Sequence, residues 1–365
     1  MTRQLSHRLD AHLPRVLVVA NDHHMGNTIL TLPIIEELAQ YFTKGIDLLI
    51  DHRYIELPAM LASSERIRVL PYQGKASSGS RASQHLRIVR KFGRLVGHRY
   101  SAVIDTVGSM RSTTVTAASL SRRRIGLSSG RRAWIYSDVI QAQFDTHYGI
   151  RYAQLLKTIG NDTEARPARL SADAPGHSDV EGILEQQFPG CENPIVVIHP
   201  MAGHPLRCWP VERFAAVADG LVERLAAKVV VIGGPGDRAI AQELIDAMRS
   251  GDCACFQVFT LPQLVALFEK ASVLVSNESG PTHLAAATDL PIVTIFGPTK
   301  ERLWRPMRDL GLTVLRGDTC DPKCRKRGCV AESRCLLNLQ VQTVLDHAIA
   351  GARVGCVHIG GPGSR

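Results

Sequence analysis

The sequence predicts an α/β protein built of two Rossmann-like domains with a cleft between them. At 365 residues, the chain is longer than one ordinary hydrophobic core accommodates. In both halves, short apolar runs typical of buried parallel strands alternate with helical stretches. Residues 161–193 are polar and rich in Pro, Gly, Asp and Glu, so we interpret them as a linker, which favours two domains over one large sheet. We place the domains at residues 1–175 and 176–365.

The first half opens with the apolar run at residues 15–20, which is typical of a buried strand. A polar loop at 21–27 then precedes a helix. The expected strands are 15–20, 47–51, 67–70 and 102–105, and the expected helices are 28–41, about 84–97 and 146–160, with a loop of small residues at 75–83. The last of these strands ends at Asp105, which a polar turn follows.

The second half repeats this alternation. Its expected strands are 195–200, 228–232, 273–276 and 291–296, and its expected helices are 211–225, 284–287 and 341–352. In the first of these helices, Phe214, Val217 and Leu221 recur at the spacing that places side chains on one helical face.

The composition restricts the class of function. With 43 Lys and Arg against 34 Asp and Glu, the net charge is +9, which favours an acidic partner such as a nucleic acid, anionic lipid or phosphorylated glycan. Aromatic residues make up only 5% and form no stacking motif, so we expect no nucleic-acid binding. No run of 18 apolar residues and no signal-peptide core is found, so we expect a cytoplasmic protein. The charge is compatible with peripheral attachment to the inner face of the cytoplasmic membrane.

Nine cysteines in a chain expected in the cytoplasm argue against a disulfide framework. Four of them lie within sixteen residues: Cys320, Cys324, Cys329 and Cys335. Their spacing differs from the paired arrangement of common zinc sites, but four neighbouring thiolates are able to hold Zn or Fe tetrahedrally. Two interpretations stay open here, a structural Zn or Fe site and a set of reduced or redox-labile thiols.

The most informative segment, residues 271–298, reads as strand, polar turn, short helix and strand. The turn contains Glu278, Ser279, Gly280 and His283. It follows the carboxyl end of a strand, which is where open α/β sheets bind ligands. Two further turns carry similar signals: residues 233–237 are rich in glycine and end in an acid, and Arg207 in R-C-W-P suits bidentate binding of phosphate.

These motifs resemble those of glycosyltransferase family 9, the lipopolysaccharide heptosyltransferases. The family typically has D-T/S-G-x-x-H-L-A-A-A followed by a strand and F-G-P-T, and here Glu278 takes the place of the usual Asp. R-C-W-P resembles the family's K/R-x-W-P, and residues 105–125 resemble D-x-x-G-x-x-R-S followed by R-R-x-G. The resemblance covers about residues 15–350 and is strongest from 195 to 300.

The resemblance implies a GT-B fold, with the acceptor bound by the first half and the nucleotide-sugar by the second. In that fold the final helix can return to the first domain, and we leave open whether helix 341–352 does so. The resemblance assigns donor binding to Ala202, Gly203, Arg207, Asp237, Glu278, Ser279, Gly280 and His283. His283 would donate to a phosphate oxygen as the nucleoside diphosphate leaves. The family's chemistry is metal-independent, and the chain has no D-x-D motif.

The catalytic base is the point at which this chain departs from the family. Many heptosyltransferases have an Asp after M-G or L-G in the first loop, whereas this chain has Met25-Gly26-Asn27. Asn27 cannot accept a proton, although it can still orient the acceptor. The candidate bases are therefore Asp22, His23, His24 and Asp105. We expect Met25, Gly26, Arg111 and Arg124 to contact the acceptor, while ordinary surface charge remains an alternative for Arg111 and for the arginines at 122–124.

We conclude from the sequence that the protein is an inverting, metal-independent glycosyltransferase. The favoured reaction transfers heptose from ADP-heptose to an acidic or phosphorylated saccharide of the lipopolysaccharide core type. Two alternatives stay open: a family 9 transferase with a protein acceptor or another nucleotide-sugar, and a non-catalytic nucleotide-sugar-binding protein.

Overall fold

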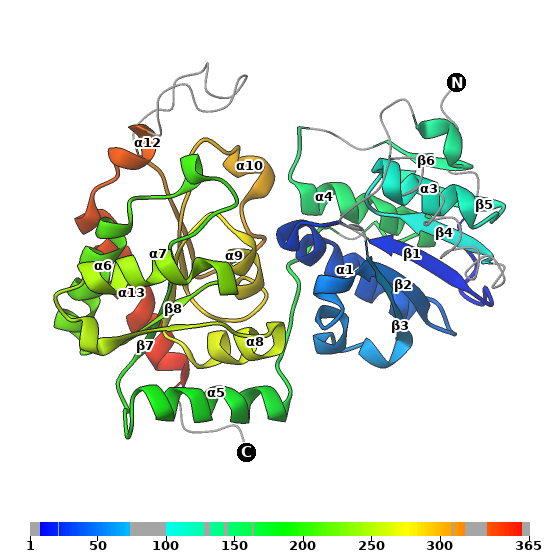
Figure 1. Cartoon of the computed structure of the whole chain (residues 1–365). Helices are drawn as coiled ribbons and strands as arrows, with labels where there is room; N and C mark the ends of the chain where they lie inside the picture. Colours follow the sequence, from blue (N-terminus) through cyan, green and yellow to red (C-terminus); the bar gives the residue numbers. More distant parts are fainter. Residues whose placement is uncertain are drawn as a thin grey trace. The chain divides into compact units, whose positions relative to one another are not determined.

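The computed structural model describes residues 8–20, 22–73, 100–127, 132–141, 145–162, 164–308, 310–317 and 334–359. The chain divides into two compact units, Met1–Ala168 and Arg169–Arg365 (Figure 1). This division falls seven residues before the boundary that we placed at 175/176. Among the described residues, each unit contains one sheet of six parallel strands flanked by helices, which confirms the predicted α/β class.

The first unit has the strand order β3-β2-β1-β4-β5-β6. Its strands are β1 (Val16–Ala20), β2 (Ile46–Asp51), β3 (Ile67–Tyr72), β4 (Ala102–Asp105), β5 (Arg123–Leu127) and β6 (Asp138–Ile140). Its helices are α1 (Met25–Tyr41), α3 (Met110–Ala118) and α4 (Tyr148–Ala153). Every residue of β1 and β4 is buried, as the apolar runs predicted.

The second unit has the strand order β12-β11-β10-β7-β8-β9. Its strands are β7 (Ile195–His199), β8 (Lys228–Ile232), β9 (Ala254–Gln257), β10 (Val273–Asn277), β11 (Ile292–Ile295) and β12 (Leu312–Leu315). Its helices are α5 (Ala174–Gln187), α6 (Val211–Leu225), α7 (Arg238–Ala247), α8 (Leu261–Lys270), α9 (Gly280–Ala285), α10 (Glu301–Trp304), α12 (Arg334–Leu337) and α13 (Val341–Ile359).

Both sheets have the Rossmann topology, in which the first and fourth strands lie side by side at the centre. In the first unit these strands are β1 and β4, and in the second they are β7 and β10. The chain leaves these two central strands in opposite directions across the sheet. The topology therefore opens a crevice at their carboxyl ends, where doubly wound folds bind their ligands.

The core of the second unit is built on the predicted periodicity of α6. Phe214, Val217 and Leu221 are all fully buried, and the ring of Phe214 meets that of Trp209 edge-on at 5.1 Å between centroids. On the same helix, Gly220 allows α13 to approach closely, because a Cβ at this position would lie 2.5 Å from a methyl carbon of Leu345. Helix α13 also contacts β10 and β11, so the contacts seen place it on the second unit.

Two helices begin earlier than the sequence indicated. Helix α1 begins at Met25, so Met25, Gly26 and Asn27 form its first turn instead of a loop. The extended backbone of His24 precedes this turn, and the His24 carbonyl accepts from both the backbone N–H and the hydroxyl of Thr28. Helix α9 likewise begins at Gly280 and not at 284, because proline is well tolerated in a first helical turn.

The expected linker at 161–193 is also wrong in part, because it contains α5. The Asp173 carboxylate accepts from the Gly176 N–H at the start of this helix, and Pro175 stands in its first turn. Helix α5 packs on α8, with Val180 and Leu184 buried. The polar composition of this segment reflects a helix with one narrow apolar face.

The helix expected over 146–160 is divided. Helix α4 ends at Ala153, and a 3-10 stretch from Gln154 to Ile159 follows it. Gly160 closes this stretch in the left-handed region, with φ of 73°. The predicted loop at 75–83 and helix at about 84–97 lie outside the described residues. In the part of the chain that the structure describes, no helix combines the length and apolarity needed to cross a bilayer.

Candidate active site

Polar side chains gather at the carboxyl ends of the central strands in both units. In the second unit they begin with His199 and Asn277, the last residues of β7 and β10. In the first unit they begin with Asp22, shortly after β1, and with Asp105, the last residue of β4.

Glu278, directly after β10, is buried, and its carboxyl group has a raised pKa. Its Oε1 lies 3.5 Å from Nη1 of Arg207, whose own side chain is 41% exposed. Burial raises the pKa of Glu278 to about 7, although Thr299 and Arg207 act in the opposite direction. Its Oε2 is buried and has no hydrogen-bond partner among the described residues. One buried carboxyl oxygen is thus left without a protein partner in the described part of the chain, next to a half-exposed guanidinium.

Ser279 connects the β10 turn to the end of β7. Its Oγ lies 3.1 Å from Nδ1 of His199 and 3.0 Å from the hydroxyl of Thr282. Burial lowers the pKa of His199 to about 4, so its ring is neutral at pH 7. A neutral imidazole beside a hydroxyl is a hydrogen-bonding pair that fixes the orientation of Ser279.

Asn277, which our sequence analysis did not single out, holds the R-C-W-P turn in place. Its Oδ1 accepts from the backbone N–H of Trp209 at 3.0 Å, and its Nδ2 donates to the carbonyl of Pro200. The side chain is fully buried. It therefore fixes the position of Arg207, two residues before Trp209, relative to Glu278. The signal in the sequence is the polar residue at the end of an apolar strand.

The remaining predicted donor residues follow the carboxyl ends of β7, β8 and β10. Gly203 is exposed, and a Cβ there would touch nothing, so its backbone is open to a ligand. Ala202 precedes it and is half-buried. Asp237 turns back on its own loop, where its Oδ2 accepts from the Gly234 N–H at 2.7 Å. Gly280 and His283 both lie in α9, where His283 is buried.

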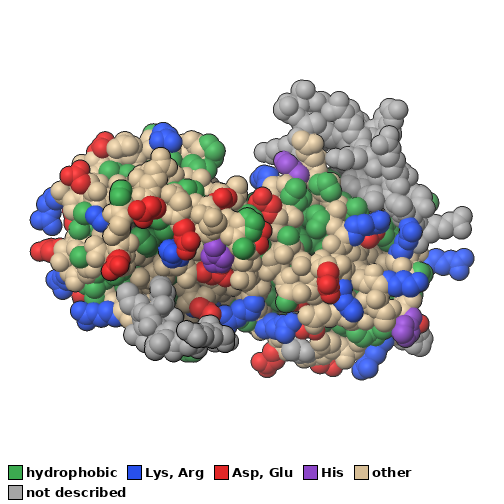
Figure 2. Space-filling model, turned by 90° about the horizontal axis from the view of Figure 1, so that it is seen from below, with side chains coloured by type: hydrophobic (Ala, Val, Ile, Leu, Met, Phe, Trp, Pro, Cys, Tyr) green, Lys and Arg blue, Asp and Glu red, His purple; other side chains and the backbone are tan. Residues whose placement is uncertain are grey.

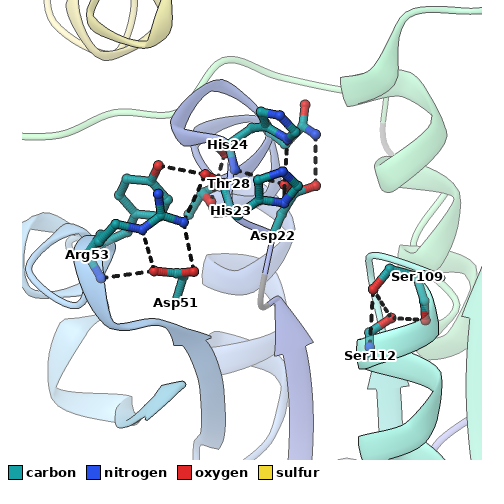
Figure 3. Close-up of polar contacts among 10 residues, drawn as sticks. Asp22, His23, His24, Thr28, Asp51, Arg53, Ser109 and Ser112 are labelled. Atoms are coloured by element: carbon teal, nitrogen blue, oxygen red, sulfur yellow. Dashed lines mark hydrogen bonds and ion pairs between the residues drawn. The ribbon is translucent and has the colours of Figure 1, made fainter. Parts of the chain in front are cut away.

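In the first unit, Asp22 is the centre of a compact polar cluster (Figure 3). Its Oδ2 accepts from the Asn27 amide at 2.8 Å, and its Oδ1 accepts from the His24 backbone N–H at 2.9 Å. The Nδ1 atoms of His24 and His23 lie 3.1 and 3.7 Å from the same oxygen. The carboxylate of Asp22, His23 and His24 together offer three atoms close enough to ligate a metal ion.

A second layer of side chains fixes this loop. The His23 carbonyl accepts from the Tyr54 hydroxyl and from Nη2 of Arg53, each at 3.0 Å (Figure 3). Asp51 in turn binds Arg53 through both carboxylate oxygens, at 2.8 and 2.9 Å. Burial favours protonation of Asp51, yet the hydrogen bonds from Arg53 hold its pKa below the usual value. These contacts connect the Asp22 loop to the end of β2.

Asp105, the other carboxylate proposed as a base, is fully engaged in the fold. It is completely buried, and burial raises its pKa above the usual value. It accepts from the backbone N–H groups of Val107 and Gly108, and from the hydroxyls of Thr116 and Tyr136. This geometry is the turn-capping role that a carboxylate at the end of a strand often has.

The predicted acceptor residues separate into two groups. Met25 and Gly26 stand in the first turn of α1, and Arg111 stands in the first turn of α3. The pKa of His23 is lowered, first by burial, then by His24, and to a smaller extent by Arg111, so Arg111 lies near the Asp22 cluster. Arg124 is not part of this group. Its guanidinium donates to the carbonyls of Ser121 and Ile135.

The structure describes only one member of the cysteine cluster. Cys335 lies in α12, is buried, and belongs to the apolar core of the second unit. Cys320, Cys324 and Cys329 lie outside the described residues. The metal site therefore stays a prediction.

Comparison with known proteins decides the family. The family model of glycosyltransferase family 9 (heptosyltransferase) matches residues 89–334. The chain belongs to this family. Among curated family 9 relatives, lipopolysaccharide heptosyltransferase 3 of Escherichia coli K12 is 25% identical over 77% of this chain and 82% of its own length. A second E. coli protein of that name is 32% identical, over 34% of this chain and 37% of its own length.

Solved structures of family 9 proteins confirm the GT-B fold. The family 9 glycosyltransferase of Veillonella parvula superposes with a TM-score of 0.79, 20% identity, and coverage of 95% of this chain and 99% of that one. ADP-heptose lipopolysaccharide heptosyltransferase II of E. coli superposes with a TM-score of 0.74 and 20% identity, and the match covers 93% of this chain and 99% of that one. The E. coli heptosyltransferase WaaC with ADP-2-deoxy-2-fluoro heptose superposes with a TM-score of 0.67 and 19% identity, and the match covers 91% of this chain and 98% of that one.

Proposed function

We propose that this family 9 glycosyltransferase transfers heptose from ADP-heptose, with inversion, to an acidic or phosphorylated saccharide of the lipopolysaccharide core, at the cytoplasmic side of the inner membrane. The names of the relatives support the sugar and the pathway, and the ADP-heptose analogue in one solved relative supports the donor. The observation that carries the proposal is the pairing of Arg207 with the buried Glu278 at the carboxyl end of β10.

This pair suits a nucleoside diphosphate-sugar. The exposed part of the Arg207 guanidinium provides forked donors for the diphosphate, and the open backbone at Gly203 leaves room for phosphate oxygens. The carboxyl group of Glu278, next to Arg207, is suited to bind a sugar or ribose hydroxyl. As the bond to the leaving diphosphate breaks, Arg207 would stabilise the charge that develops on it.

We propose Asp22 as the base that accepts the proton of the attacking acceptor hydroxyl. The family's usual Asp is replaced by Asn27, and the amide of Asn27 donates to Oδ2 of Asp22. The carboxylate function would thus have moved five positions towards the N-terminus, with Asn27 orienting it. Asp105 suits the role less well, because it is completely buried and its carboxylate accepts from both backbone and hydroxyl groups of its own fold.

Steady-state turnover of the full chain tests the proposal, with ADP-heptose as donor and deacylated lipopolysaccharide core as acceptor. We expect transfer that EDTA does not abolish, and anomeric inversion seen by NMR of the product. D22N should lower kcat by roughly a hundredfold or more, while the KM for ADP-heptose changes little. D10N is the matched control, since Asp10 also caps an exposed turn, through the His12 N–H.

Three outcomes would contradict parts of this scheme. Equal loss of activity in D10N and D22N would remove Asp22 as the base. Activity lost with EDTA and restored by a divalent cation would remove metal independence. Binding of ADP-heptose without transfer to any saccharide would favour a protein acceptor or a non-catalytic binder.

The Zn or Fe predicted at the cysteines is tested separately, by elemental analysis of the same purified protein.

A further inference from the structure

Two large apolar side chains stand exposed at the amino end of β5 in the first unit. Leu120, two residues after α3 ends, is 75% exposed, and Trp134 in the 3-10 turn Ala133–Ile135 is 78% exposed. Isolated exposed apolar residues are ordinary on protein surfaces. The exposure of Leu120 and Trp134 indicates a binding surface only if the two residues lie close together in the fold.

The guanidinium of Arg124 joins the two loops that carry these side chains. Its Nη1 donates to the carbonyl of Ser121, the residue after Leu120, and its Nε donates to the carbonyl of Ile135, the residue after Trp134, each at 2.6 Å. One planar group therefore clamps both loops. The two loops that carry the exposed Leu120 and Trp134 therefore lie side by side.

The backbone holds Leu120 in an unusual conformation. Its φ is 52°, in the left-handed region that non-glycine residues rarely adopt. A residue with a bulky side chain adopts this conformation at a cost in free energy of folding, and here that side chain is left in solvent and not packed in the core. The fold thus retains a leucine at a position where glycine would suit the backbone better.

Basic residues lie close to both Leu120 and Trp134 in the chain. Arg122 and Arg132 are both exposed, and they flank Leu120 and Trp134 in the chain. The first unit as a whole carries 23 Lys and Arg against 13 Asp and Glu, whereas the second carries 20 against 21. The entire positive excess of the protein therefore lies in the first unit, and Lys and Arg outnumber Asp and Glu on the face of that unit seen in Figure 2.

We propose that Leu120, Arg122, Arg132 and Trp134, which we name the β5 patch, dock the first unit on an anionic lipid bilayer. Trp favours the interface between headgroups and acyl chains, and each nearby Arg gains from a negative surface potential. A second copy of the chain fits less well, because two-fold pairing would set one positive patch against another. The patch lies at the amino end of β5, whereas the Asp22 cluster follows the carboxyl end of β1.

Vesicle binding of the full chain tests the proposal without reference to the transferase reaction. Flotation with phosphatidylcholine vesicles is compared with flotation with vesicles that also contain phosphatidylglycerol. We expect binding to the anionic vesicles only, weakened by salt. W134A should lower the partition coefficient roughly tenfold, and R122S and R132S roughly fivefold each.

Matched variants separate docking from folding. I240A removes an exposed apolar side chain of α7 in the second unit, and R224S an exposed arginine of α6, and both should bind as the parent does. L120G relieves the left-handed backbone, so it should be at least as stable as the parent in urea while binding vesicles several-fold more weakly.

The emission of Trp134 gives an independent reading, because it should shift to shorter wavelength on anionic vesicles, and W134F should lose the shift. Equal partition of W134A and the parent would overturn the proposal, and so would equal binding to neutral and anionic vesicles. A concentration-dependent dimer that W134A abolishes, with vesicle binding unchanged, would assign the β5 patch to self-association instead.

Discussion

Replacing Glu278 by Gln tests whether this buried carboxyl controls the stability of the second unit. Burial raises the pKa of Glu278 from its ordinary 4.5 to about 7, so the folded protein binds this proton more tightly than the unfolded chain does. The stabilising effect of the proton is complete below pH 4.5 and is lost as the pH rises towards 7. Glutamine has nearly the shape of the protonated acid but cannot ionise, so E278Q should escape this loss.

The magnitude follows from the two pKa values. Each pH unit between them changes the free energy of unfolding by about 1.4 kcal/mol, so the parent should lose about 3 kcal/mol that E278Q retains. Urea unfolding at several pH values between 4 and 8.5, roughly the range set by these pKa values, measures the difference. In a W134F background the remaining tryptophans, Trp209 and Trp304, both lie in the second unit, so the fluorescence reports on that unit.

The comparison needs a glutamate that is not buried. Glu212, exposed in the first turn of α6, supplies it, and E212Q should follow the pH dependence of the parent. If E278Q and the parent lose stability in parallel as the pH rises, the reasoning is refuted. Such a result would mean that Arg207 and Thr299 outweigh burial and keep Glu278 ionised.

Two further substitutions test the packing and the polar frame. G126A should lower the free energy of unfolding by about 1–3 kcal/mol in urea, because the new Cβ would lie 2.3 Å from the buried Tyr136 ring; unchanged stability would show that the ring moves aside freely. N277A leaves the Trp209 N–H and the Pro200 carbonyl unbonded, so it should cost about 2 kcal/mol and raise the KM for ADP-heptose with a smaller change in kcat; an unchanged KM would separate Asn277 from the donor site.

Much of the fold follows from local patterns in the sequence. The ranges of β4, β8 and α6 are those expected, because each is an uninterrupted apolar run or a regular 3–4 repeat. The errors occur where polar residues form regular structure. Helix α5 was interpreted as linker because only Val180, Leu184 and a small glycine face inwards along its length. Short edge strands such as β12 contain too few residues to show a recognisable alternation of apolar and polar side chains.

The candidate site was predicted less evenly. Glu278, Ser279 and Arg207 could be identified because each stands in a recognisable turn, and the structure places Glu278 beside Arg207. Asn277 and His199 were missed as site residues because their roles depend on partners about 70 to 80 positions away in the chain. The hydrogen bonds from Arg124 to two separate loops could not be predicted either, because nothing in the local sequence distinguishes Arg124 from its arginine neighbours.

The amide of Asn277 has a consequence for changing which sugar this enzyme transfers. It bonds the turn after β7 to the strand that precedes Glu278, although the two segments are far apart in the sequence. A substitution in either segment displaces the other through this side chain, so the best residue at one depends on the residue at the other. Mutant libraries that vary residues 200–209 and 277–283 separately would miss the productive combinations, whereas a library that recombines both segments would sample them.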